Sequence, residues 1–179
     1  MPLLENELLL LRAPEPTDID FLYHWENDTD IWQTGITHSP FSKFTLSKYL
    51  ETAHLDIIEA KQQRFIIVLK STKNKAIGTV DIFDYDIFNN RAGIGILIAE
   101  KQDRQKGYAF NTLKLICEYC FSTLDMVQLY CNIDTTNTSS INLFEKIGFE
   151  AIGVKKKWTR RNDGYHDELL MQIINPKYR

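Results

Sequence analysis

A short basic loop between a predicted strand and a predicted helix constrains the fold of this chain more than any other feature. The apolar run from Ala92 to Ala99 predicts a buried strand. After Gly107 in the loop, apolar residues recur at spacings of three and four, which indicates a long amphipathic helix. The free N–H groups and the dipole of a first helical turn favour an anion such as pyrophosphate. Taken alone, the loop is equally typical of a helix cap flanked by surface charge.

A second informative segment, residues 137–149, lies one predicted strand downstream. Together the two segments resemble the GNAT superfamily of acetyl-CoA-dependent N-acetyltransferases. The loop fits the family pattern at Arg104, Gly107 and Ala109. The later segment fits it at Asn137, Ser140, Leu143, Phe144, Glu145, Lys146, Gly148 and Phe149. Residues 165–171 also resemble the last strand of the branch that acetylates ribosomal-protein N-termini and of the related polyamine acetyltransferases, so the resemblance covers nearly the whole chain.

The resemblance implies an α/β (α+β) GNAT fold over residues 1–179, as a single domain. Its central sheet is mixed, mostly antiparallel and six- to seven-stranded, with about four flanking helices. Residue patterns predict a polar loop at 28–42 and helices at about 17–27, 45–60, 108–122 and 138–147. They predict strands at 8–12, 64–70, 77–84, 92–99, 126–133, 151–158 and 166–174.

Composition is that of one ordinary globular domain. Of the 179 residues, 44% are hydrophobic and 25% are charged, and no apolar run approaches the ~20 residues that span a bilayer. The acidic start of the chain does not read as a signal peptide, which predicts a cytoplasmic protein without a membrane partner. A net charge of -3 gives no attraction to nucleic acid. Cys117, Cys120 and Cys131 fit core positions better than a redox pair.

The family resemblance implies a donor site for acetyl-CoA and no metal. The pantetheine arm would lie along the strand that contains Ile96, Leu97 and Ile98, and a backbone N–H near Leu97 would hold the thioester oxygen. These apolar side chains are also typical of plain core. The remaining residues expected to bind the donor are Arg104, Gln105, Lys106, Gly107, Tyr108, Ala109, Asn137, Ser140 and Phe144.

Proton transfer is where this sequence departs from the commonest family pattern. Many members carry a tyrosine at the position of Phe144, and its hydroxyl protonates the sulfur of the coenzyme. Phenylalanine donates no proton, so water, Ser140 or an unassisted thiolate has to take its place. For the base, hairpin pairing brings Asp81 and Asp84 beside the pantetheine-binding strand, although both are equally typical of solvated carboxylates.

The acceptor is the least constrained part of the site. The resemblance places the loop 28–42 over the acceptor amine, and Trp32 within it either lines the pocket or packs. A cluster formed by Glu26, Asp28 and Asp30 is more typical of an ordinary helix end than of a cation site. The resemblance implies direct attack by a primary amine of a small molecule, such as a polyamine, an amino sugar or a drug, or of a protein N-terminus. The alternative function is that of a non-catalytic acyl-CoA sensor or scaffold. The oligomeric state, monomer or homodimer, stays open.

Overall fold

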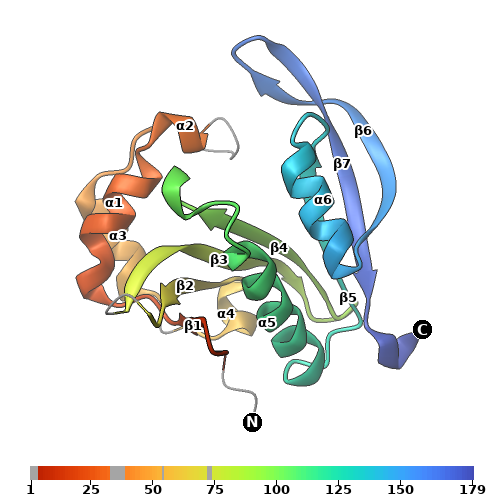
Figure 1. The fold of residues 1–179 in the computed structure, drawn as a ribbon, viewed down its shortest axis with the longest axis horizontal. Coiled ribbons are helices and arrows are strands. Elements are labelled where there is room, and N and C mark those ends of the chain that lie inside the picture. The colour runs from red at the N-terminus through yellow and green to blue at the C-terminus, as the bar shows by residue number, and fades with distance from the viewer. Residues whose placement is uncertain (1–3, 33–38, 54, 72–73) are drawn as a thin grey trace.

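The structure, a computed structural model, describes residues 4–32, 39–53, 55–71 and 74–179. Its centre is a seven-stranded sheet in the order β1-β2-β3-β4-β5-β7-β6 (Figure 1). Neighbouring strands are antiparallel except for β4 and β5, which are parallel, so the expected mixed, mostly antiparallel sheet is confirmed. The strands are β1 (Leu9–Arg12), β2 (Gln63–Leu69), β3 (Lys75–Asp86), β4 (Arg91–Ile98), β5 (Gln128–Asp134), β6 (Glu150–Arg161) and β7 (Gly164–Ile174).

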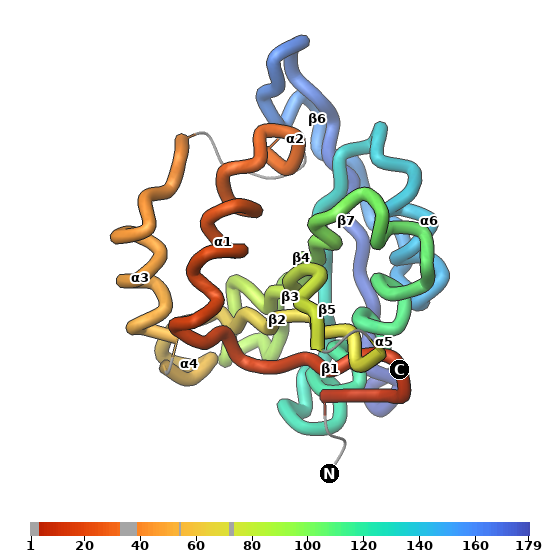
Figure 2. Tube along the Cα trace, turned by 60° about the vertical axis from the view of Figure 1, so that its left-hand side comes forward, coloured from red at the N-terminus to blue at the C-terminus, as the bar shows by residue number. Residues whose placement is uncertain are grey.

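Helices cover both faces of the sheet. Figure 2 shows α1 and α3 on one side of the strands and α5 and α6 on the other. The side covered by α1 and α3 is called the α1 face below, and the opposite side the α5 face. The helices in the described residues are α1 (Ile19–Glu26), α2 (Thr29–Trp32), α3 (Lys43–Glu51), α4 (Ile57–Ala60), α5 (Tyr108–Ser122) and α6 (Thr138–Ile147).

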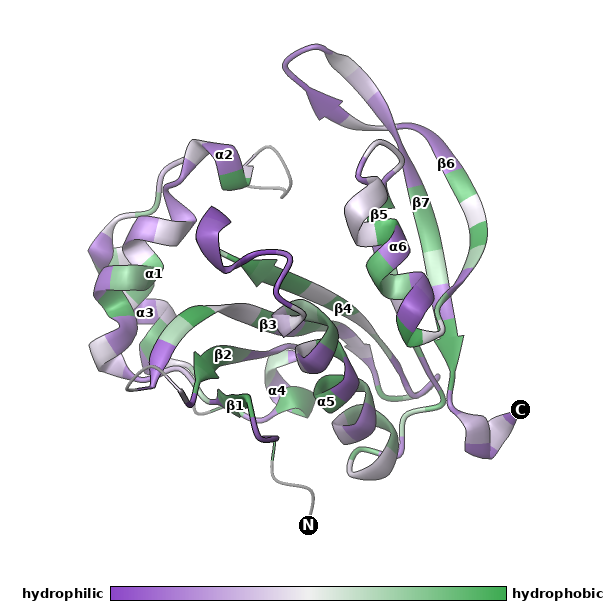
Figure 3. Ribbon diagram, viewed as in Figure 1, coloured by the Kyte–Doolittle hydropathy of each residue, from purple (hydrophilic) through white to green (hydrophobic). Residues whose placement is uncertain are grey.

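Alternation along the strands divides the core between the two faces. On β2, Ile66 and Val68 pack with Leu22 and Trp25 of α1, whereas Ile67 belongs to the larger cluster on the α5 face. Successive strand residues point to opposite faces, and both faces are covered, so central strands are apolar throughout. Figure 3 accordingly shows β2 and β4 coloured largely as hydrophobic. The three cysteines are buried as predicted, and burial raises the pKa of the Cys117 thiol to about 12.

Two helix predictions need correction. The single helix expected at 45–60 is two, α3 and α4, because the Asp56 carboxylate accepts hydrogen bonds from the N–H groups of Ile58 and Glu59 and starts a new helix. The loop expected at 28–42 contains α2, and its residues 33–38 lie outside the described part of the chain. These one-turn helices raise the helix number above the predicted four. Within the described residues, no helix is long and apolar enough to cross a membrane.

The two halves of the sheet meet along a very short seam. The pairing of β4 with β5 is confined to Arg91–Gly93 on β4 and Gln128–Tyr130 on β5. Beyond these three residue pairs, β5 continues alongside β7, whereas β4 continues alongside β3 alone. The strands therefore separate, and residues 94–98 of β4 have no strand partner on the β5 side among the described residues.

Candidate active site

The open half of β4 is the centre of the candidate site. Ala92, Gly93 and Ile94 are buried, whereas Gly95, Ile96, Leu97 and Ile98 are each partly exposed. This change follows directly from the loss of the β5 partner. A strand with one free edge presents unpaired backbone N–H and C=O groups, which can pair with an extended ligand.

The register shows which groups face the gap. Ala99 donates its N–H to the carbonyl of Ile77, before β3, at 2.9 Å, and a Cβ at Gly78 of β3 would collide with the carbonyl oxygen of Leu97. By the alternation of an antiparallel ladder, Leu97 therefore directs its N–H toward β3. The N–H groups of Ile96 and Ile98 face the gap instead. A main-chain donor near Leu97 for the thioester oxygen stays a prediction, and the neighbouring Ile96 and Ile98 are the residues whose N–H groups face the gap.

The loop after β4 leads into α5 with its N–H groups free. Gly107 is the N-cap of α5 with φ at +79°, and Gln105 also has a positive φ of 59°. In the described part of the chain, Asn111 is the first residue from Gln105 onward whose N–H has an acceptor, the Gly107 carbonyl at 3.1 Å. Tyr108 and Ala109 are therefore in the free first turn, where the sequence predicts an anion site.

The Arg104 side chain is bonded to the end of β4. Its Nε donates to the carbonyl of Ile98 at 3.0 Å and its Nη2 to the carbonyl of Ala99 at 2.7 Å. The guanidinium thus fixes the end of β4 against the loop. Lys106 is exposed next to Gly107, and its Nζ lies 4.0 Å from Asp103 Oδ1, at the outer limit of an ion pair.

α6 lies on the α5 face. Two of its residues that were expected to bind the acetyl-CoA donor, Asn137 and Phe144, contact other parts of the protein. The Asn137 Oδ1 accepts the Ser140 N–H at 3.1 Å, so Asn137 caps the helix. Phe144 is only 3% exposed and packs edge-on against Phe149, with ring centroids 5.0 Å apart. Of the two surroundings expected for Phe144, the coenzyme arm or the core, the structure places it in the core.

On the α1 face, Asp81 lies opposite Gly95 and is held by an arginine. Arg64 Nε and Nη2 donate to the two Asp81 oxygens at 2.6 and 3.1 Å, and Arg64 Nη1 contacts Glu26 at 2.6 Å. The Arg64 head also lies over the Tyr49 ring. Burial alone would lower the pKa of Arg64, but Asp81 and Glu26 raise it above its usual value. Asp81 and Glu26 are thus ion-pair partners rather than free carboxylates.

Asp84 has a different environment. It lies in a bulge of β3 with φ at +51°, and it forms no ion pair within the described residues. The hydroxyl of Tyr130 on β5 donates to its Oδ2 at 3.3 Å. The Tyr130 ring stands edge-on to Phe83 at 5.9 Å between centroids, above Gly93, where a Cβ would collide with the Phe83 ring. Sequence reasoning did not find Tyr130 or Gly93, because only the pairing of distant strands brings them to Asp84.

The segment expected to cover the acceptor is partly described. Trp32 is half-buried and donates from Nε1 to the Glu26 carbonyl at 2.5 Å, so it packs at the end of α2. Asp30 pairs with Lys101 at 2.8 Å, which joins α2 to the loop after β4. The two segments border a shallow hollow of about 350 Å³, lined by Asp28, Asp30, Ala99, Glu100, Lys101, Gln102 and Arg104.

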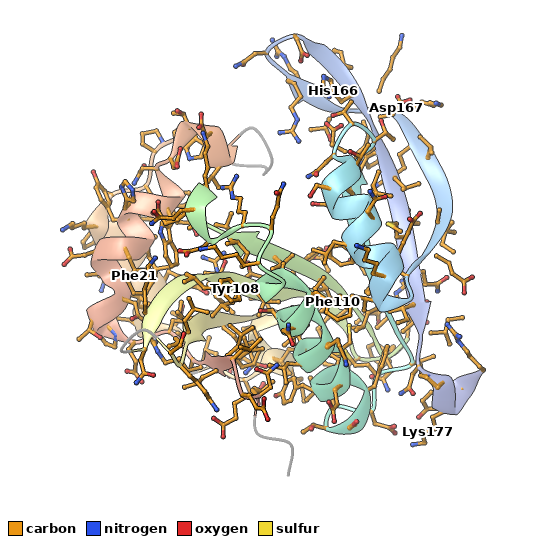
Figure 4. All side chains as sticks on the ribbon, in the orientation of Figure 1. Phe21, Tyr108, Phe110, His166, Asp167 and Lys177 are labelled. Carbon is orange, nitrogen blue, oxygen red and sulfur yellow. The ribbon has the colours of Figure 1, made fainter. Side chains whose placement is uncertain are left out.

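His166 joins β7 to the end of β5. Its Nδ1 lies 2.9 Å from Asp134 Oδ2, and its Nε2 lies 2.9 Å from Asp163 Oδ1. The hydrogen bond predicted to fix the last strands is therefore present, far from Tyr108 at the start of α5 (Figure 4). No group of three or more His, Cys, Asp or Glu side chains in the described residues is arranged to hold a metal ion.

Comparisons with known proteins agree with this geometry. Residues 9–150 match the family model of the acetyltransferase (GNAT) domain. The spermidine N(1)-acetyltransferase of Vibrio cholerae serotype O1 is 25% identical over 173 residues, covering 97% of this chain and 96% of that protein. The spermidine N(1)-acetyltransferase of Escherichia coli K12 is 24% identical, covering 94% and 87%.

Among solved structures, spermidine N-acetyltransferase from Vibrio cholerae, in complex with CoA and spermine, superposes with a TM-score of 0.86. That alignment covers 97% of this chain and 99% of the other at 24% identity, so it supports the fold. The family model spans well over half of the sequence. On this ground, the chain belongs to the GNAT family of acetyltransferases.

Proposed function

We propose that this enzyme transfers the acetyl group of acetyl-CoA to a primary amine of a small polyamine, by direct attack of the amine on the thioester. Acetyl-CoA is the donor of the GNAT acetyltransferases to which the chain belongs. The observation that carries the proposal is the open half of β4, which ends next to the free first turn of α5. The named activity of the Vibrio cholerae and Escherichia coli relatives makes spermidine the first acceptor to test.

The donor would be recognised mainly by main-chain groups. The N–H groups of Ile96 and Ile98 face the gap and suit the amides and the thioester carbonyl of an extended arm. The N–H groups of the first turn of α5, with the exposed Lys106, suit the pyrophosphate. Such contacts need backbone geometry more than particular side chains. They stabilise the oxyanion that develops as the amine attacks.

The acceptor would approach from the α1 face, where the carboxylates lie. A cationic amine needs a negatively charged partner that is not already neutralised. Asp81 and Glu26 share Arg64, whereas Asp84, the other predicted base candidate, forms no ion pair within the described residues. At the sulfur, Phe144 provides no acid, so the leaving thiolate would take its proton from water.

Two further assignments follow from the same proposal. The enzyme would act in the cytoplasm, where acetyl-CoA is supplied. A protein N-terminus remains the second acceptor class, because residues 165–171 resemble the branch that acetylates ribosomal proteins. We keep a homodimer as an expectation that sedimentation velocity can test.

An acceptor panel assayed for release of free CoA tests the function. The panel contains spermidine, spermine, a short peptide with a free N-terminus, and an amino sugar. We expect saturable CoA release with a polyamine and weaker release with the others. Tight acetyl-CoA binding without CoA release for any amine would instead establish the non-catalytic sensor or scaffold.

A further inference from the structure

Two asparagine side chains join the start of the chain to the glycine loop before α5. Asn111 of α5 donates from Nδ2 to the carbonyl of Gly107 at 3.0 Å. Its Oδ1 accepts a hydrogen bond at 3.2 Å from Nδ2 of Asn6, which lies before β1. Both asparagines are partly exposed, and neither belongs to the residues that the sequence predicts to bind the donor.

Backbone groups fix the direction of both side-chain amides. The Asn6 Oδ1 accepts the N–H groups of Leu8 and Leu9, each at 2.9 Å, so the Asn6 Nδ2 is left to donate. An amide nitrogen only donates, so it meets the oxygen of Asn111 and turns the Asn111 Nδ2 toward Gly107. Leu9 is fully buried in β1, and its carbonyl accepts the Asn6 N–H. The turn that carries Asn6 is therefore anchored to an edge strand of the sheet.

Gly107 is a residue whose conformation depends on such a contact. It has φ at +79° and no side chain, so its backbone is freer than that of other residues. Its carbonyl accepts the Asn111 N–H at 3.1 Å, which is the ordinary first bond of a helix. The Asn111 Nδ2 adds a second bond to the same oxygen, and this bond holds the carbonyl in one direction.

A fixed Gly107 carbonyl also fixes the first N–H of α5. The peptide bond is planar and trans, so the C=O of Gly107 and the N–H of Tyr108 lie in one plane and point in opposite directions. The carbonyl points along the helix to Asn111, and the Tyr108 N–H therefore points out of the helix start. Within the described residues this N–H has no acceptor, and it is one of the donors proposed above for the pyrophosphate.

We infer that Asn111 is a positioning residue for the acetyl-CoA donor and that Asn6 holds Asn111 in place. This inference rests on the proposed function, which assigns the pyrophosphate to the first turn of α5. Asn111 bonds to Gly107 and touches neither the reacting atoms nor the phosphates. It directs the Tyr108 N–H before the donor arrives, so less order has to be created on binding.

The test uses Asn111→Ala, Asn6→Ser and the double variant. Alanine removes the side-chain bond to Gly107 and is a good helix former, so α5 should stay intact. Serine at position 6 keeps an oxygen for the neighbouring backbone N–H groups but has no amide to donate to Asn111. Circular dichroism checks that each variant is folded, and affinities are compared per folded molecule.

The chain supplies a matched control at the end of α1. Asn27 donates from Nδ2 to the carbonyl of Tyr23, four residues earlier, at 2.8 Å, as Asn111 does to Gly107. Asn27→Ala therefore removes the same kind of contact from another helix. It should bind acetyl-CoA as tightly as the wild type.

We expect Asn111→Ala to weaken acetyl-CoA binding about fivefold in a calorimetric titration, the size of a typical hydrogen bond. The KM for acetyl-CoA should rise, and kcat with spermidine should stay unchanged. Asn6→Ser should lose less, and the double variant should equal Asn111→Ala, because Asn6 acts through Asn111. With S-acetylpantetheine, which has no pyrophosphate, the wild type and Asn111→Ala should not differ in kcat/KM.

Unchanged acetyl-CoA affinity in a folded Asn111→Ala would overturn the inference, as would an equal loss with S-acetylpantetheine or in Asn27→Ala. Additive losses in the double variant would overturn the part assigned to Asn6. In all these cases, acetyl-CoA binding and amine turnover by the wild type leave the proposed function standing. A wild type that neither binds acetyl-CoA nor acetylates an amine fails the proposed function and this inference with it.

Discussion

Gly107 has a conformation that few other residues adopt. Its φ of +79° lies in the left-handed region, where a side chain is strained, although the space around a Cβ there is open, with Asn111 Nδ2 the nearest atom at 3.9 Å. A residue at this position therefore affects the anion site through charge and through backbone preference rather than through collision within the free protein.

We expect Gly107→Glu to abolish acetyl-CoA binding, because it adds negative charge beside the N–H groups meant for the pyrophosphate. Gly107→Asn is the matched control, since asparagine tolerates a positive φ and adds no charge. It should retain most of the affinity in a calorimetric titration. A folded glutamate variant that binds as tightly as the wild type would remove the assignment of this loop.

Phe144 allows a prediction about stability rather than about coenzyme binding. Its ring is almost fully buried against Phe149, so Phe144→Ala should lower the free energy of unfolding by about 3–5 kcal/mol in urea denaturation. Phe144→Leu should lose clearly less. Unchanged stability together with weaker acetyl-CoA binding would show that the ring contacts the coenzyme instead.

At this scale the sequence revealed residue types but not their neighbours. The phenylalanine at position 144 and the glycine at position 107 can both be read from the sequence. The Tyr130–Asp84 contact joins residues 46 positions apart, and it depends on the register of two strand pairs and on Gly93 between them. The same holds for Arg104 and Leu97. The direction of the Arg104 side chain and that of the Leu97 N–H depend on hydrogen bonds at the end of β4, which the sequence does not reveal.

Among the elements, α5 and α6 have the predicted bounds, because strong apolar periodicity coincides with clear end signals. Gly148 ends α6 with φ at +110°, and Asn137 begins it. The region of α3 and α4 was mispredicted because its apolar spacing continues across the break, and the Asp56 cap outweighs that spacing locally.

Asn137 permits a test that separates capping from ligand binding. Asn137→Ala should lower the free energy of unfolding by about 1 kcal/mol, because the Ser140 N–H loses its acceptor. Asn137→Ser keeps a capping oxygen but has no amide group, so its stability should stay near that of the wild type. If both variants bind acetyl-CoA less tightly, the amide of Asn137 contacts the donor. If neither does, Asn137 is a cap alone.

His166 makes the tie between β5 and β7 sensitive to pH. The hydrogen bond to Asp134, helped by Asp163, raises the pKa of His166 above its usual 6.5. A group whose pKa is raised by folding stabilises the protein fully below the unfolded pKa, and this contribution is lost as pH rises through the folded pKa.

The expected result is a fall in melting temperature from pH 5.5 to pH 8.5 that is smaller in His166→Gln than in the wild type. His24→Gln, which changes an exposed histidine on α1, should keep the full fall. Thermal unfolding followed by circular dichroism at several pH values checks this. If the melting temperature of the wild type and of His166→Gln depends on pH in the same way, the contact between His166 and Asp134 does not depend on the charge of the histidine.

For the whole molecule, family resemblance and strand patterns were sufficient to predict the sheet, its mixed character and the glycine-containing loop before α5. They did not reveal how short the seam between the two halves is. The length of the β4–β5 pairing depends on where the two strands diverge, and it involves residues more than 30 positions apart in the chain, from Arg91 to Tyr130. The proposed acceptor side is the least predictable, because the residues proposed for it come from elements far apart in the sequence.

The free edge of β4 has a consequence for amide hydrogen exchange. The N–H groups of Ile96 and Ile98 face the gap, so without donor they should exchange with deuterium quickly, whereas Leu97 and Ala99, bonded toward β3, should exchange slowly. Saturating acetyl-CoA should slow Ile96 and Ile98 and leave the other two nearly unchanged. Residue-resolved NMR exchange would then show protection at every second amide without the donor, and along the whole strand once the donor occupies its edge.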